Sequence, residues 1–300
     1  MGRHVLDTDV LPRSFLYVPG DRPDLIEKAL AGSADALILD LEDAVPIGRK
    51  EKARRGLREW FAATFVAGAP VVRPQIWVRI SQGSIIDDLT AVVGPGLAGI
   101  MQAKCSEAAL REAGASLNEL ERSRGLEPLS VGMIGLVEDA RSLQDLESMA
   151  AVPRIVTFAI GEVDLMADLR MSRTVAAESA LDSIRARVVV ACAAAGLLPP
   201  LAPTSTAIRD LEAFEQSSRK MLDLGFRSRT AVHPSQLAVI HDVFTPSAVD
   251  VESARDVVER FDLAGGGVAV DAAGRMIDAA VVRGAQETLI RSAQRYEIPA

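Results

Sequence analysis

The chain has 300 residues, of which 49% are hydrophobic and 25% are charged, so it has the composition of a globular protein with a large core. Its net charge of −8 argues against a general nucleic-acid binder, because neutralising phosphates requires a basic surface. The two cysteines, Cys105 and Cys192, are too few for a disulfide framework, and we expect them to be buried core residues in a reducing cytoplasm.

The N-terminal segment and the longest apolar stretch give no sign of export or of a membrane span. Residues 1–12 mix charges with short apolar pieces and lack the apolar stretch of a signal peptide. The stretch Val188–Leu198 is too short to cross a bilayer and runs into two prolines. We therefore expect a soluble, cytoplasmic protein with no membrane partner.

Short strand-like runs alternate with longer amphipathic runs along the chain. The expected strands are Ser14–Val18, Ala36–Leu41, Ile76–Ile80, Gly99–Ala103, Ser130–Leu136, Arg154–Ile160, Leu197–Ala202 and Thr230–Val232. The expected helices include Pro23–Ala31, Arg49–Phe65, Glu107–Arg124, Ala177–Ala195 and Ile208–Leu224. Apolar strands joined by helices indicate a parallel sheet covered on both faces, and eight such units favour a closed TIM (β/α)8 barrel. A doubly wound open sheet is the alternative, but no G-x-G-x-x-G fingerprint follows the first strand.

The composition changes after the eighth unit. A helix is expected from Thr245 to Phe261, with Ser247 as its N-cap. The flexible run Gly265–Gly267 follows, and a second helix is expected from Asp278 to Arg295. We therefore predict a TIM barrel catalytic domain over residues 1–244 and a C-terminal helical lid extension over residues 245–300.

Charged residues follow the ends of the expected strands, where the active groups of a parallel barrel gather. In chain order they are Asp40, Glu42, Asp43, Arg79, Lys104, Glu138, Asp164 and His233. Acids at adjacent strand ends are costly to bring together without a cation, so Glu138 and Asp164 predict a two-carboxylate site for Mg²⁺ or Mn²⁺. Glu42 and Asp43 would then hold the metal-bound waters in place.

Each of these residues also has a simpler structural interpretation. A single acid after a strand, such as Glu138, is commonly a helix N-cap or an ion-pair partner. Arg79 could neutralise the acids or stabilise a developing oxyanion, and its spacing alone does not choose between the two roles. His233 precedes a proline and is expected to be a structural hydrogen-bonding residue. The convergence of several acids and Arg79 on one face of the barrel favours the functional interpretation.

Several short motifs occur along nearly the whole chain, in an order and at spacings that follow a known pattern. The motifs are Arg13–Gly20 (RSFLYVPG), Ile38–Val45 (ILDLEDAV), Val78–Ile80, Glu138, Gly161–Asp164, Val232–Gln236 and Met276–Asp278. In these motifs the chain resembles the citrate lyase β-subunit-like proteins of the HpcH/HpaI aldolase superfamily. The resemblance implies a TIM barrel that binds Mg²⁺ and an acyl-CoA thioester and assembles as a homotrimer or hexamer.

The same resemblance implies a role for each matching residue. Glu138 and Asp164 are implied as the metal ligands, and Arg79 as a catalytic residue that contacts the substrate oxygens and the enolate. Arg13 and Glu138 are implied as further substrate-binding residues. Asp278 matches a catalytic acid that relatives insert into a neighbouring subunit's active site, although spacing alone would make it a helix N-cap.

The expected function is a Mg²⁺-dependent carbon–carbon lyase. It would cleave a 3-hydroxyacyl-CoA of the citramalyl-, malyl- or citryl-CoA type to an acyl-CoA such as acetyl-CoA and a 2-oxo acid. The alternatives are a class II aldolase acting on non-CoA hydroxy-oxo acids, a citrate lyase β-like subunit active only in a complex, and a binding module for a phosphorylated ligand. Departures from the family pattern at Ser81, Ala103, Arg229 and Pro200–Thr206 leave the metal site intact and the acyl group open.

Overall fold

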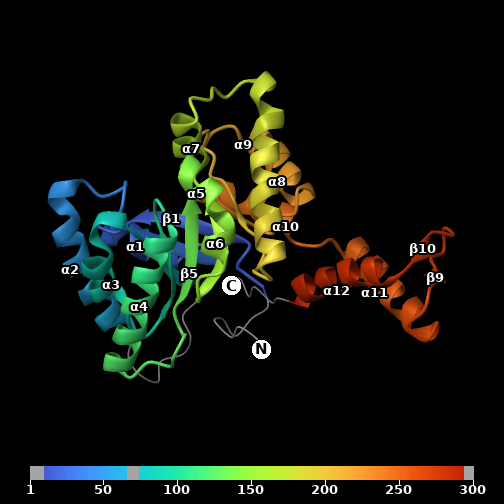
Figure 1. Ribbon diagram of the computed structural model, residues 1–300, viewed down its shortest axis with the longest axis horizontal. Coiled ribbons are helices and arrows are strands. Elements are labelled where there is room, and N and C mark those ends of the chain that lie inside the picture. Colours follow the sequence, from blue (N-terminus) through green and yellow to red (C-terminus); the bar gives the residue numbers. More distant parts are fainter. Residues whose placement is uncertain (1–9, 66–73, 294–300) are drawn as a thin grey trace. The chain divides into compact units, whose positions relative to one another are not determined.

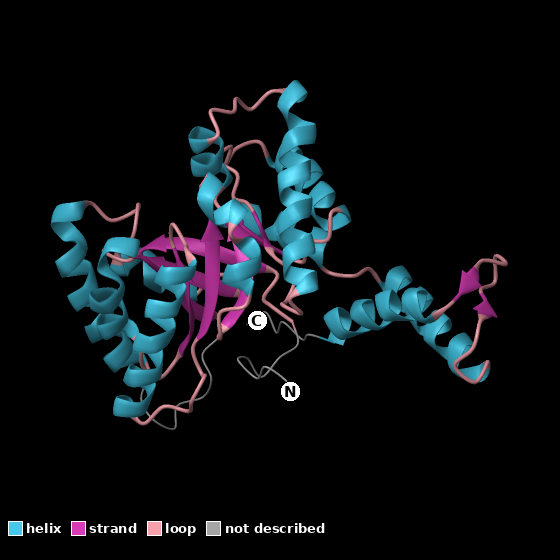
Figure 2. Ribbon diagram, in the orientation of Figure 1, coloured by secondary structure: helices cyan, strands magenta, loops and turns pink. Residues whose placement is uncertain are grey.

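The computed structural model describes residues 10–65 and 74–293 of the chain. Within them, eight parallel strands form a closed barrel in which each strand pairs with the next and β8 pairs with β1. Figure 2 shows these strands with helices around them. The strands are β1 (Ser14–Pro19), β2 (Ala36–Asp40), β3 (Gln75–Ile80), β4 (Leu97–Gln102), β5 (Gly132–Val137), β6 (Ile155–Ile160), β7 (Leu201–Ala202) and β8 (Ser228–Ala231). The predicted TIM barrel is confirmed, and the doubly wound alternative is excluded because the sheet closes on itself.

Helices follow the strands in sequence and cover the outside of the barrel (Figure 1). They are α1 (Pro23–Leu30), α2 (Lys50–Thr64), α3 (Ile85–Val92), α4 (Glu107–Arg124), α5 (Ala140–Gln144), α6 (Leu146–Ala150), α7 (Glu162–Asp168), α8 (Glu178–Ala194), α9 (Leu211–Asp223) and α10 (Leu237–Phe244). Their apolar residues recur at helical spacing; in α2, for example, Ala53, Leu57 and Phe61 are buried. The helices therefore form because one stripe of each can be buried against the strands.

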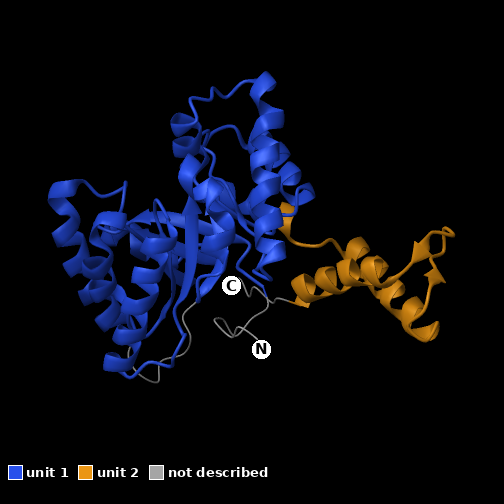
Figure 3. Ribbon diagram, viewed as in Figure 1, with its two compact units in different colours: residues 1–241 blue, residues 242–300 orange. Residues whose placement is uncertain are grey.

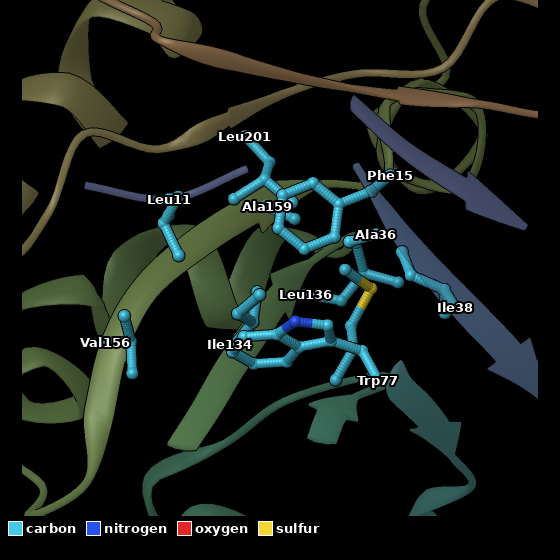
Figure 4. Close-up of a cluster of buried hydrophobic side chains, with 11 residues drawn as sticks. Leu11, Phe15, Ala36, Ile38, Trp77, Ile134, Leu136, Val156, Ala159 and Leu201 are labelled. Atoms are coloured by element: carbon cyan, nitrogen blue, oxygen red, sulfur yellow. The ribbon is translucent and has the colours of Figure 1, made fainter. Parts of the chain in front are cut away.

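Buried apolar side chains fill the interior of the barrel (Figure 4). Phe15 of β1 and Trp77 of β3 meet there edge to face, with ring centroids 5.9 Å apart. Gly99 of β4 makes room for the indole, because a Cβ atom at this position would lie 2.2 Å from a Trp77 ring carbon. The filled interior leaves the ends of the strands, and the loops beyond them, as the place for a site.

Two predicted elements differ most from expectation, and each is four residues shorter than predicted. The strand predicted over Leu197–Ala202 is reduced to the two residues of β7, because Pro199 and Pro200 have no backbone N–H to donate to a neighbouring strand. The helix predicted from Ile208 begins at Leu211, where the Asp210 carboxylate accepts a hydrogen bond from the amide of Ala213 at 3.0 Å. Both cysteines are buried and unpaired by disulfides, as predicted.

The chain divides into two compact units, residues 1–241 and residues 242–300 (Figure 3). The second unit contains α11 (Ala248–Leu263), the two-stranded sheet of β9 (Ala269–Val270) and β10 (Met276–Ile277), and α12 (Ala279–Ala293). Ser247 caps α11 as predicted, in a capping box with Asp250. The predicted end of the last helix, Arg295, lies outside the described residues. No helix in the described part of the chain is both long and apolar enough to span a membrane.

Candidate active site

A cavity of about 400 Å³ lies where the barrel strands end and the following loops begin. It is lined by Tyr17, Pro19, Asp40, Asp43, Ala44, Arg79, Leu136, Glu138, Ala159, Ile160, Gly161, Glu162, Val163, Asp164, Thr204, Thr230 and Val232. Four residues predicted for the site, Asp43, Arg79, Glu138 and Asp164, are therefore brought together around one space. Such a cavity at the carboxyl end of the strands is the usual active site of this fold.

Arg79, near the end of β3, is held in place by Asp40 at the end of the neighbouring strand β2. Its Nε and Nη2 atoms donate to the two Asp40 carboxylate oxygens at 2.7 and 2.6 Å. The backbone amides of Glu42 and Ala44 donate to the same oxygens at 2.8 and 3.0 Å. Burial opposes the charge of Arg79, but the hydrogen bonds with Asp40 outweigh it and raise the arginine pKa. The guanidinium is thus a fixed cation beside the cavity, which suits a substrate carboxylate or oxyanion.

Glu138 directly follows β5, and its side chain is buried. Burial raises the pKa of Glu138 to about 7, and the negative charges of Glu42 and Asp164 act in the same direction. Its Oε1 atom accepts a hydrogen bond from the backbone amide of Lys104 at 2.5 Å. Gly161 leaves the space that the carboxylate occupies, since a Cβ there would lie 2.8 Å from Oε2. A buried carboxylate facing other acids fits a divalent cation, because the cation would offset both burial and repulsion.

Asp164 lies in the first turn of α7 and is exposed at the cavity. Its negative charge contributes to the raised pKa of Glu138. The nearby acid Glu162 has a different environment, because Arg173 and Arg185 bind its carboxylate at 2.5 and 2.6 Å. The described residues contain no cluster of three or more His, Cys, Asp or Glu side chains arranged to hold a metal ion. A cation held by Glu138 and Asp164 would therefore take its other oxygens from water and substrate.

Glu42 and Asp43 lie between these groups, in the loop after β2. Glu42 bridges two cations: its Oε1 is 3.0 Å from Lys104 Nζ, and its Oε2 is 3.2 Å from Arg79 Nη1. Burial opposes ionisation of Glu42, but Arg79 and Lys104 outweigh it and lower the glutamate pKa. Asp43 is more exposed than Glu42, but its partial burial and the hydrogen bond and charge of Glu42 raise its pKa. The sequence analysis included Asp40 and Lys104 among the strand-end residues but did not predict their roles as partners of Arg79 and Glu42.

Arg13 does not belong to this cluster, and its predicted contact with substrate is withdrawn. It precedes β1, at the amino end of the strands, whereas the cavity lies at their carboxyl end. Its guanidinium makes two hydrogen bonds to Asp35, which precedes β2, at 2.8 and 2.9 Å. Arg13 therefore ties the starts of two strands together.

Asp278 and His233 both cap helices. Asp278, in the second unit, accepts hydrogen bonds from the amides of Ala280 and Val281 at 2.9 and 3.0 Å and so caps α12. These bonds involve Oδ1, and a catalytic role for Asp278 stays a prediction. His233 accepts a hydrogen bond from the amide of Ser235 at 3.2 Å, which agrees with its predicted structural role.

The barrel matches known proteins in sequence and in structure. The HpcH/HpaI aldolase/citrate lyase family matches residues 13–234. The L-malyl-CoA/beta-methylmalyl-CoA lyase of Cereibacter sphaeroides is 31% identical over an alignment 310 residues long, which covers 94% of this chain and 94% of that protein. The citrate lyase subunit beta-like protein of Mycobacterium tuberculosis is 30% identical over 286 residues, covering 93% of this chain and 94% of the relative.

The fold is also similar to that of a solved structure. Protein CitE from Mycobacterium tuberculosis, in complex with magnesium, acetoacetate and coenzyme A, aligns with a TM-score of 0.73 and 28% identity. The alignment covers 94% of this chain and 98% of that chain. The matched family region contains the whole strand-end cluster from Asp40 to Asp164, and the chain belongs to the HpcH/HpaI aldolase/citrate lyase family.

Proposed function

We propose that the chain is a Mg²⁺-dependent carbon–carbon lyase that cleaves a carboxylate-bearing 3-hydroxyacyl-CoA to an acyl-CoA and a 2-oxo acid. One observation carries the proposal: the buried acid Glu138 and the acid Asp164 share a cavity with Arg79, which Asp40 holds in place. The names of the relatives support the substrate class, because they include a malyl-CoA lyase and a protein bound to magnesium and coenzyme A. Citramalyl-, malyl- and citryl-CoA all have the required groups.

Glu138 and Asp164 would hold the cation, for which Mn²⁺ is a possible substitute. When bound, Mg²⁺ supplies Lewis-acid polarisation of the substrate's hydroxyl and carboxylate oxygens. Glu42, fixed between Lys104 and Arg79, together with Asp43, would orient water around the ion.

Arg79 would bind the substrate carboxylate and offset the charge that develops during cleavage. The 3-hydroxyl group would give its proton to Asp278, the C2–C3 bond would break, and the electron pair of that bond would move to C2 to give the acyl-CoA enolate. The former C3 leaves as the carbonyl carbon of the 2-oxo acid. Asp278 would return a proton to C2 of the enolate, completing a retro-Claisen-type reaction.

The decisive test is to incubate the pure chain and Mg²⁺ with citramalyl-, malyl-, citryl- and 3-hydroxy-3-methylglutaryl-CoA and to identify the products. We expect one thioester to be cleaved, and Glu138→Gln to abolish the reaction. Cleavage of free hydroxy-oxo acids but of no thioester would identify an aldolase instead. If nothing is cleaved, the lyase proposal fails; cleavage that resists EDTA would overturn the metal assignment.

We also propose a homotrimer or hexamer in which Asp278 serves a neighbouring subunit. The exposed apolar side chains Val268, Val270 and Met276, on and beside the β9–β10 sheet, support a contact made by the second unit. Mixing the inactive variants Asp278→Ala and Glu138→Gln under subunit exchange would then restore activity, because some sites would receive both intact residues. Sedimentation would give the subunit number. No recovery in verified mixed oligomers would place Asp278 in its own subunit's site or outside catalysis.

A further inference from the structure

Lys104 has an unusual backbone for its residue type. It follows β4 directly and has a φ of 47°, in the left-handed region that a lysine seldom occupies because its Cβ is crowded there. The backbone on either side is fixed by the barrel: the amide of Ala103 donates to the carbonyl of Ile80 at 3.1 Å, and the amide of Cys105 donates to the carbonyl of Leu136 at 3.4 Å. The conformation is therefore imposed by the surrounding strands, and such strain concentrates at functional sites.

The left-handed conformation directs the Lys104 amide to the candidate metal ligand. This N–H donates to Glu138 Oε1 at 2.5 Å, so one oxygen of the buried carboxylate is held by backbone rather than by a movable side chain. The bond leaves Oε2 as the oxygen beside Gly161. Partners that orient a ligand in this way commonly tune metal affinity.

The side chain of Lys104 acts on a second acid of the cluster. Its ammonium is 3.0 Å from Glu42 Oε1, while Arg79 Nη1 is 3.2 Å from Glu42 Oε2. Glu42 is thereby fixed at both oxygens, and through Glu42 the ammonium also restrains Arg79. The ammonium is half exposed, so it remains well hydrated, and we expect it to influence geometry more than metal charge balance.

We propose that Lys104 is a positioning residue for this site. Its backbone amide sets the orientation of Glu138 for cation binding, and its ammonium sets the orientation of Glu42 and Arg79 for turnover. The inference rests on the proposed Mg²⁺-dependent function. The contact of the amide is tested by Mg²⁺ binding, and the contact of the ammonium is tested by turnover.

Variants of Lys104 separate the two contacts. Lys104→Gly removes the ammonium but accepts the left-handed backbone, whereas Lys104→Val removes the ammonium and disfavours that backbone. Lys104→Ala has a smaller backbone penalty and is measured in parallel in case the valine variant does not fold. Leu129→Val is the matched control, because Leu129 also has a positive φ, of 64°, but lies outside the cavity lining.

Mg²⁺ binding is measured by titration calorimetry, without turnover. We expect Lys104→Gly and Leu129→Val to bind like the wild type, and Lys104→Val to bind about tenfold more weakly, with Lys104→Ala between them. In the cleavage assay at saturating Mg²⁺, Lys104→Gly should lose about tenfold in kcat/KM, and Lys104→Arg should recover most of it.

Equal Mg²⁺ affinities for the glycine, alanine and folded valine variants would overturn the role of the amide. Full activity of Lys104→Gly would overturn the role of the ammonium. A wild-type chain that binds no Mg²⁺ would overturn the proposed function and this inference together, whereas equal binding by all variants together with full activity of Lys104→Gly would overturn this inference alone.

Discussion

Replacing Glu138 by glutamine tests whether the structure stores electrostatic energy at the candidate metal site. Burial raises the pKa of Glu138 from an ordinary value of 4.5 to about 7, with Glu42 and Asp164 adding to the effect. In the metal-free protein the ionised carboxylate is therefore a cost, which glutamine removes. We expect Glu138→Gln to be more stable than the wild type above neutral pH, although it should no longer bind Mg²⁺.

The sign and size of this effect follow from proton binding. Between pH 4.5 and about 7 the folded protein holds a proton on Glu138 that the unfolded chain has released, so the free energy of unfolding falls as the pH rises through this range. A shift of this size corresponds to about 3 kcal/mol in all, of which about 2 kcal/mol develops between pH 5 and pH 8. The loss is complete above pH 7 and absent well below pH 4.5.

The assay is urea unfolding of both proteins in EDTA at several pH values from 5 to 8. The stability difference between glutamine variant and wild type should grow by about 2 kcal/mol over this range, with the value at pH 5 as the internal reference. Glu147→Gln, a change on the exposed surface of α6, should give a constant difference. Parallel curves for Glu138→Gln and wild type would refute the reasoning. Added Mg²⁺ should stabilise only the proteins that retain Glu138.

Three further changes test other parts of the structure. Gly161→Ala places a Cβ 2.6 Å from that of Glu138, so calorimetry should show about tenfold weaker Mg²⁺ binding in a folded protein. Arg154→Met removes the guanidinium that lies 2.5 Å from the carboxylate of Glu121, a side chain only 2% exposed. The unpaired buried charge should lower the free energy of unfolding in urea by about 3–5 kcal/mol, and an unchanged midpoint would contradict this. Arg13→Ala should lower the unfolding midpoint without raising KM, and a raised KM would restore Arg13 to the site.

The barrel could be predicted because its signal is local and repeated. Each strand is a short apolar run, each helix has an apolar stripe, and the alternation leaves few other folds. The one strand with a large error, β7, contains a local exception, since Pro199 and Pro200 keep the apolar pattern while removing the amides that a strand needs. Apolar periodicity reports burial, but strand pairing also requires hydrogen-bond donors.

The candidate site was predictable only in part. The direction of the predicted parallel strands was enough to predict that Glu138, Asp164 and Arg79 lie close together, because it determines the end of the barrel at which each residue lies. Arg13 precedes the first strand and so lies at the opposite end of the barrel, and the structure therefore does not support its assignment by resemblance. Pairings such as that of Lys104 with Glu42 depend on side-chain directions and loop dihedrals, which single-sequence spacing does not encode.

The distribution of ion pairs supports the proposal that the cation site lies at Glu138 and Asp164 rather than at other acids around the cavity. The other acids around the cavity form ion pairs. Asp40, Glu42 and Asp43 all pair with Arg79, and Glu42 also pairs with Lys104. Glu162 pairs with Arg173 and Arg185. Among the described residues, neither Glu138 nor Asp164 has an ion-pair partner. Their like charges repel, and burial penalises one of them, so a divalent cation would lower the energy most at this pair. The neighbouring acids already have ion-pair partners, and they would therefore hold the arginine and water around such an ion instead of competing for it.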